Sequence, residues 1–173
     1  MRVAQIAAAA FAAVSLATPA VAQTMVPPPV KTVKLSGPRF GLTSLSDASV
    51  ARLRDAGVEL RPLITQFGWQ FEKVFYTKDS GLSAVNEWVI LFGGLEQSVA
   101  IPSLSWIVGL RTSEGAEFGF GPNLSPTGVG FAAAAGVTFR SGALNVPVNV
   151  AVVPSKSGTR ISILSGFNFR GQR

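Results

Sequence analysis

The sequence predicts an all-β protein: about eight antiparallel strands in a meander that closes into a small barrel, with one short helix between strands 1 and 2. Large apolar residues alternate with small or polar residues in segment after segment, which is the two-residue period of strands. Short segments rich in Gly, Ser and Pro separate these runs, as hairpin turns do. Only 14% of the residues are charged, compared with about 25% in ordinary soluble domains.

The first 22 residues have the pattern of a secretory signal peptide. Arg2 precedes an apolar run over 6–17, which is too short to span a bilayer, and Ala20-Val21-Ala22 is a small-x-small cleavage site. We therefore expect the chain to be exported across the inner membrane. The expected organisation is a signal peptide at 1–22, a Pro-rich linker at 23–34 and a single β domain at 35–173.

Composition excludes several kinds of chemistry. The chain has no Cys and no His, which removes disulfides, zinc sites built on these residues, and catalytic triads or dyads that use them. No Asp-rich loop is present for calcium or magnesium, so we expect no metal and no cofactor. After Glu117 no acidic residue occurs, and the remaining cations are too sparse for a nucleic-acid site. We expect these cations at turns and strand ends: Arg140, Lys156, Arg160, Arg170 and Arg173.

The first strand and the helix are expected close together in the chain. The strand is expected at about 38–43 and the helix at 47–56. Asp47 is a candidate N-cap, Val50 and Leu53 share one side, and Gly57 is placed to end the helix.

The second strand has the clearest alternation. Phe67, Trp69 and Phe71 share one face of the segment 64–72, and Gln70 and Glu72 share the other. Similar alternation predicts strands at about 102–110, 116–121, 128–139, 145–153 and 161–169. The segment 85–92 is apolar on both faces, which predicts a more buried strand.

The face opposite the large apolar residues consists of Gly, Ala, Ser, Asn and Gln with few charges, which is the inverted pattern of a membrane barrel. From Gln66 onward, and in its leader, the chain resembles the small outer-membrane β-barrel proteins of Gram-negative bacteria. Phe167-Asn168-Phe169 is similar to the aromatic terminal strand that the barrel-assembly machinery recognises in that family. Four residues follow Phe169, however, and Leu164 stands where the family usually has Gly. The segments GPRFGL, QFGWQFE and EFGFGPN also resemble an uncharacterised secreted family, which implies no activity.

The predicted function is therefore a small, non-enzymatic outer-membrane barrel with an envelope structural, adhesion or limited-permeation role. Its expected partners are outer-membrane lipid and, if it is inserted, the barrel-assembly machinery; no nucleic acid is expected. The lumen candidates are Gln70, Glu72 and Glu117, and the candidate interface anchors are Trp69, Trp88 and Trp106.

Two alternatives remain open. The first is a soluble periplasmic or secreted β-barrel that binds an apolar or lipid ligand inside. The second is a secreted hydrolase with a carboxylate pair drawn from Glu87, Glu96, Glu114 and Glu117. The direction in which the aromatic side chains point discriminates between a carrier and a membrane barrel.

Overall fold

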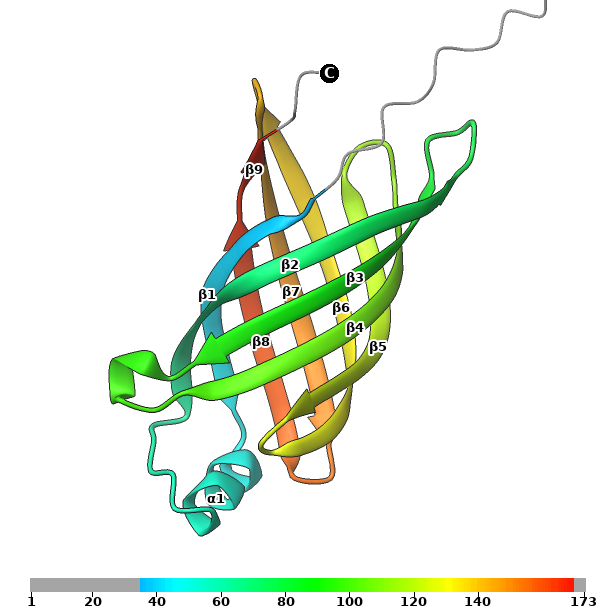
Figure 1. Ribbon diagram of the computed structural model, residues 1–173. Coiled ribbons are helices and arrows are strands. Elements are labelled where there is room, and N and C mark those ends of the chain that lie inside the picture. The colour runs from blue at the N-terminus through cyan, green and yellow to red at the C-terminus, as the bar shows by residue number, and fades with distance from the viewer. Residues whose placement is uncertain (1–34, 170–173) are drawn as a thin grey trace, which may run out of the picture.

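The computed structural model describes residues 35–169, which form a closed antiparallel β-barrel with a short helix at one end (Figure 1). Eight strands form the wall in chain order, and β1 pairs with β8 to close it. The elements are β1 Gly37–Leu45, α1 Asp47–Asp55, β2 Leu63–Thr77, β3 Ser83–Gly93, the 3-10 helix η1 Leu95–Gln97, β4 Ile101–Arg111, β5 Ala116–Ser125, β6 Gly128–Ser141, β7 Leu144–Ser155, β8 Gly158–Gly166 and β9 Asn168–Phe169.

The strands are strongly staggered around the barrel. A path through directly opposed residues runs from Gly37 of β1 across every strand to Gly158 of β8. Leu45 of β1 lies opposite Arg160, so Gly158 lies opposite a position two residues beyond Leu45. The barrel therefore closes with a stagger of about ten residues, which for eight strands corresponds to a tilt of about 40°.

The two ends of the barrel differ. At the end that we call the terminal end, β1 begins, β8 ends and short turns join β2 to β3, β4 to β5 and β6 to β7. At the opposite end, which we call the helix end, α1 and η1 lie in the two longer connections (Figure 1). Turns of two residues join β5 to β6 and β7 to β8 there.

The predicted barrel of eight antiparallel strands and the single short helix between β1 and β2 are confirmed. One further strand was not expected. Phe167 interrupts the last predicted strand, and the short β9 beyond it pairs with β7 rather than β1. The signal peptide at 1–22 and the linker at 23–34 lie outside the described residues.

Helix α1 is tied to the barrel wall by its N-cap. The cap is Ser46 rather than Asp47, because the Ser46 backbone is extended and its Oγ accepts the Ser49 N–H at 3.4 Å. The same Oγ accepts the Thr159 N–H at 3.0 Å, and the Ser46 N–H donates to the Thr159 carbonyl at 2.9 Å. Gly57 follows the helix with a φ of 80°, as its predicted role in ending the helix requires.

The outer surface of the barrel carries the large apolar side chains. Phe67, Trp69 and Phe71 of β2 are 50%, 45% and 51% exposed and point away from the interior. The same alternation continues around the wall, where Phe and aliphatic side chains are exposed and the residues between them are buried. Strand β3 follows this rule too, so the prediction of a more buried strand is wrong: Trp88, Ile90 and Phe92 are exposed. On its inward face, Val89 and Leu91 pack with Leu164 inside the barrel, whereas Ser83 and Glu87 are buried polar residues of the same face.

Among residues 35–169, no helix combines the length and the apolar character needed to cross a membrane.

Candidate functional site in the barrel interior

The interior of the barrel is rich in polar side chains, with two small apolar clusters among them. Alternation turns every second side chain of each strand inward, and these positions hold Gln, Ser, Thr, Asn, Arg and Glu far more often than the outward positions do. The three lumen candidates, Gln70, Glu72 and Glu117, belong to this inward set: Gln70 is 4% exposed, and the side chains of Glu72 and Glu117 are 0% and 7% exposed.

Arg111, the last residue of β4, holds together the ion cluster at the terminal end. Its Nη1 donates to Glu72 Oε1 at 2.7 Å, and its Nη2 contacts Glu72 Oε2. Its Nε donates to Glu117 Oε2 at 2.8 Å, and its Nη2 donates to Glu87 Oε1 at 3.1 Å. Four neighbouring strands, β2 to β5, thus bring three carboxylates onto one guanidinium whose own side chain is 4% exposed. We call these four residues the Arg111 cluster.

Arg39 connects this cluster to the start of β1. Its Nε donates to Gln70 Oε1 at 2.9 Å, and its other nitrogens donate to the carbonyls of Pro38 and Leu35. The Leu35 N–H donates in turn to Glu72 Oε1 at 3.1 Å. The segment before β1 is thereby held over the terminal end, with Leu35 fully buried.

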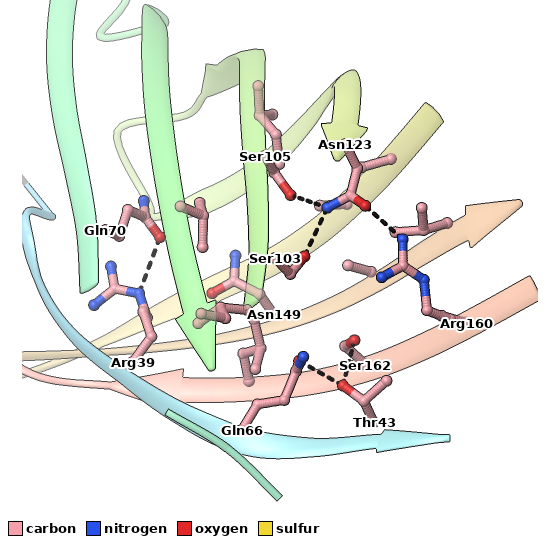
Figure 2. Close-up of a pocket in the computed structure, with 18 of the residues that line it drawn as sticks. Arg39, Thr43, Gln66, Gln70, Ser103, Ser105, Asn123, Asn149, Arg160 and Ser162 are labelled. Carbon is pink, nitrogen blue, oxygen red and sulfur yellow. Dashed lines mark hydrogen bonds between the residues drawn. The ribbon is translucent and has the colours of Figure 1, made fainter. Parts of the chain in front are cut away.

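A small cavity of about 60 Å³ lies below this cluster in the middle of the barrel. Asn123 Nδ2 donates to the hydroxyls of Ser103 at 2.9 Å and Ser105 at 2.8 Å, and Asn123 Oδ1 accepts from Arg160 (Figure 2). On another part of the wall, the Thr43 hydroxyl bonds Gln66 Oε1 at 2.6 Å and the Ser162 hydroxyl at 2.7 Å (Figure 2). Side chains fill most of the interior, and the space that remains is enough for a few water molecules.

The helix end of the barrel is covered by an apolar cluster. Val50 and Leu53 of α1 pack against Leu45, Ile64 and Ile101, which are the inward residues nearest that end of their strands. Val58, Leu60 and Val99 from the two longer connections add to this cluster. The apolar side of α1 is thus used to cover the mouth of the barrel, which explains why a helix is inserted between the first two strands.

The three tryptophans all lie on the outer surface, 42–45% exposed. Trp88 and Trp106 are the middle residues of β3 and β4, lie directly opposite each other and stack with their ring centroids 5.8 Å apart. The Trp106 indole N–H donates to Asn86 Oδ1 at 2.6 Å on the same outer face. These rings therefore lie halfway along their strands; a role as interface anchors stays a prediction.

Comparison of the chain with protein-family models, curated proteins and solved structures finds no match. The function must therefore be argued from the barrel itself.

The candidate carboxylates are brought together only in part. Glu87 and Glu117 meet in the Arg111 cluster, whereas Glu96 lies in η1 at the helix end and Glu114 in the turn between β4 and β5 at the terminal end. Among residues 35–169, no three or more acidic side chains are arranged to hold a metal ion. The three carboxylates of the Arg111 cluster instead form ion pairs with the guanidinium of Arg111.

Sequence reasoning missed three functional candidates, the interior arginines. Arg39 and Arg111 were not singled out, and Arg160 was expected at a turn or strand end. All three side chains are buried inside the barrel, with residue exposures of 2%, 3% and 6%. The alternation of the sequence could have placed two of them on the inner face. Arg39 shares its face with Thr43, and Arg111 shares its face with Gly109 and Ser105.

Proposed function

We propose that this protein is a small, non-enzymatic β-barrel of the outer membrane with a structural role in the envelope. The observation that carries the proposal is the inversion of the two faces. Large aromatic and aliphatic side chains are exposed all around the barrel. The Arg and Glu side chains of the strands lie inside, except for Arg140, which is exposed near the terminal end of β6. A soluble barrel gains its stability from the opposite arrangement, since apolar surface left in water is unfavourable.

The dimensions of the wall fit a bilayer. Strands β3 and β4 have eleven residues each. At a rise of about 3.3 Å per residue and a tilt of about 40°, such a strand covers about 28 Å along the barrel axis, close to the hydrocarbon thickness of about 30 Å. The partners that this proposal implies are outer-membrane lipid and the barrel-assembly machinery.

The filled interior favours a structural role over permeation. The central cavity, between the Arg111 cluster at the terminal end and α1 at the helix end, has only about 60 Å³, and a second cavity beside Glu117 has about 10 Å³. The same volume argues against a soluble carrier, because pockets for small organic ligands measure about 300–1,000 Å³. It also leaves the carboxylates of the Arg111 cluster without a cleft in which a glycoside could lie, which supports the non-enzymatic assignment.

Charged substitutions on the outer face test the proposal. Ile163 is outward and 57% exposed in the middle of β8, and Ser44 is outward at the helix end of β1. In a bilayer, Ile163→Arg is expected to cost about 2–4 kcal/mol and the matched control Ser44→Arg about 0–1 kcal/mol, because the penalty depends on depth. Guanidinium unfolding of the protein in phosphatidylcholine vesicles measures both. Equal, small effects would contradict membrane insertion.

Two further measurements address location directly. Lipids brominated in the middle of their acyl chains should quench the fluorescence of the outward tryptophans, because these residues lie halfway along their strands. In the native host, the protein should remain in the outer-membrane pellet through carbonate and urea washes. Release into the wash, or recovery from the periplasm, would instead favour a soluble barrel.

A further inference from the structure

Arg160 is a buried cation at the helix end of the interior, well separated in the fold from the Arg111 cluster. It lies in β8 directly opposite Leu45 of β1 and Val153 of β7, both of which are buried and apolar. Its side chain points into the central cavity, where Asn123 accepts its hydrogen bond (Figure 2). The residue is 6% exposed, so bulk water does not solvate the guanidinium.

Arg160 has no carboxylate partner within residues 35–169, where every ion pair involves Arg111. The remainder of the chain contains no Asp or Glu that could supply one. Glu87 lines the same cavity, but its carboxylate is bonded to Arg111. The charge of Arg160 is therefore met by a neutral amide alone, although a buried charge is costly unless it is paired.

The hydrogen-bonding capacity of Arg160 is also only partly used. A guanidinium has five N–H donors in a fixed fork, and here Nη2 donates to Asn123 whereas Nε is buried without an acceptor in the described part of the chain. The two N–H groups of the Asn123 amide donate to Ser103 and Ser105, so Asn123 offers Arg160 its Oδ1 alone, and this oxygen accepts from Nη2. A buried donor left without a partner indicates an acceptor that the protein itself does not provide.

From this geometry we propose that the barrel interior binds a small inorganic anion at Arg160, with chloride as the simplest member of the class. The cavity beside Arg160 has about 60 Å³, whereas a water molecule needs only about 10–15 Å³ of such space. An ion with one or two waters fits, and an organic acid or a lipid headgroup does not. The hydroxyls of Ser103, Ser105 and Ser162 also line this cavity. The inference does not depend on the location of the barrel in a membrane.

The first test is the effect of chloride on unfolding. The purified full-length protein, folded in detergent micelles, is unfolded in urea at increasing chloride, with gluconate replacing it to keep ionic strength constant. Gluconate is too large for the cavity. The expected result is a stabilisation that grows with the logarithm of the chloride concentration once this exceeds the dissociation constant: at ten times that constant, the ratio of folded to unfolded protein is about tenfold higher. Arg160→Gln should remove this dependence, and Arg52→Gln, at an exposed position of α1, should retain it.

The second test locates the ion directly. Crystals grown in bromide should show an anomalous peak within about 3.5 Å of the Arg160 nitrogens, which is contact distance for an anion on N–H donors. No peak, together with identical unfolding in chloride and gluconate, would mean that the cavity holds water only and would overturn the proposal. Chloride dependence that persists in Arg160→Gln would overturn it as well. If that variant does not fold, the bromide peak in the unchanged protein decides.

Discussion

The Arg111 cluster makes the sharpest energetic prediction. Arg111→Met replaces the guanidinium with an apolar side chain of similar length and leaves three carboxylates facing one another. The Glu72 side chain is 0% exposed, and those of Glu117 and Glu87 are 7% and 11% exposed, so water cannot take over the lost bonds. Removing one partner of a buried ion pair costs about 3–5 kcal/mol. We expect Arg111→Met to lower the free energy of unfolding by that amount, a factor of at least about a hundred in the folded-to-unfolded ratio.

The same cluster predicts a much smaller effect when a carboxylate is removed. Glu87→Gln keeps the shape and an oxygen that can accept from Arg111 Nη2, which lies 3.1 Å from Glu87 Oε1. It also lowers the repulsion among three carboxylates that share one cation. We therefore expect Glu87→Gln to change stability by less than about 1 kcal/mol and to recover part of the loss when it is combined with Arg111→Met.

Unfolding in urea, followed by fluorescence of the outward tryptophans, measures all four members of this double-mutant cycle. Arg52→Met is the matched control, because Arg52 is an exposed arginine of α1. If Arg111→Met unfolds within about 1 kcal/mol of the unchanged protein, or if Glu87→Gln is equally destabilising, then the cluster is hydrated and the reasoning from a buried ion pair is wrong.

Three further predictions concern the outer wall and the helix end. Asn86→Leu leaves the Trp106 indole N–H without its acceptor and should lower the free energy of unfolding in vesicles by about 1–3 kcal/mol. Adding Trp106→Phe should recover part of this loss, whereas additive losses in the double mutant would contradict the pairing. Gly68→Ala places a Cβ 1.9 Å from a carbonyl oxygen of β3, so a clear loss of stability in urea is expected, and unchanged unfolding would show that the strands separate there easily. Hydrogen bonds from Thr65 hold the pKa of the Glu96 carboxyl at about 2, below its unfolded value of about 4.3. The ionised Glu96 carboxylate therefore stabilises the fold fully above about pH 4.3, and this stabilisation is lost as the pH falls through 2. Glu96→Gln should abolish that part of the pH dependence of the unfolding midpoint. The change in midpoint is expected to be small, because solvent screens the charge of the exposed Glu96.

The local features of this protein could be predicted from its amino-acid sequence. Alternation with a period of two identified the strands and sorted their side chains into two faces, so Gln70, Glu72 and Glu117 could be assigned to the face opposite the large aromatic residues. That this face points into the barrel came from the closed structure. The helix after β1 could also be predicted, since its apolar positions and Gly57 lie within ten residues of one another. These properties depend on contacts along the chain, which a sequence displays directly.

Which inward residues contact one another depends on the closed barrel. Arg111 lies 39 residues from Glu72 and 24 from Glu87, and the stagger between strands brings them to one height. The same register leaves Arg160 between Leu45 and Val153, away from every carboxylate that the Arg111 cluster uses. Alternation assigns a face but not a height along the barrel axis, and height depends on the pairing register of all eight strands together. The partners of the buried charged side chains could therefore be identified only from the closed barrel.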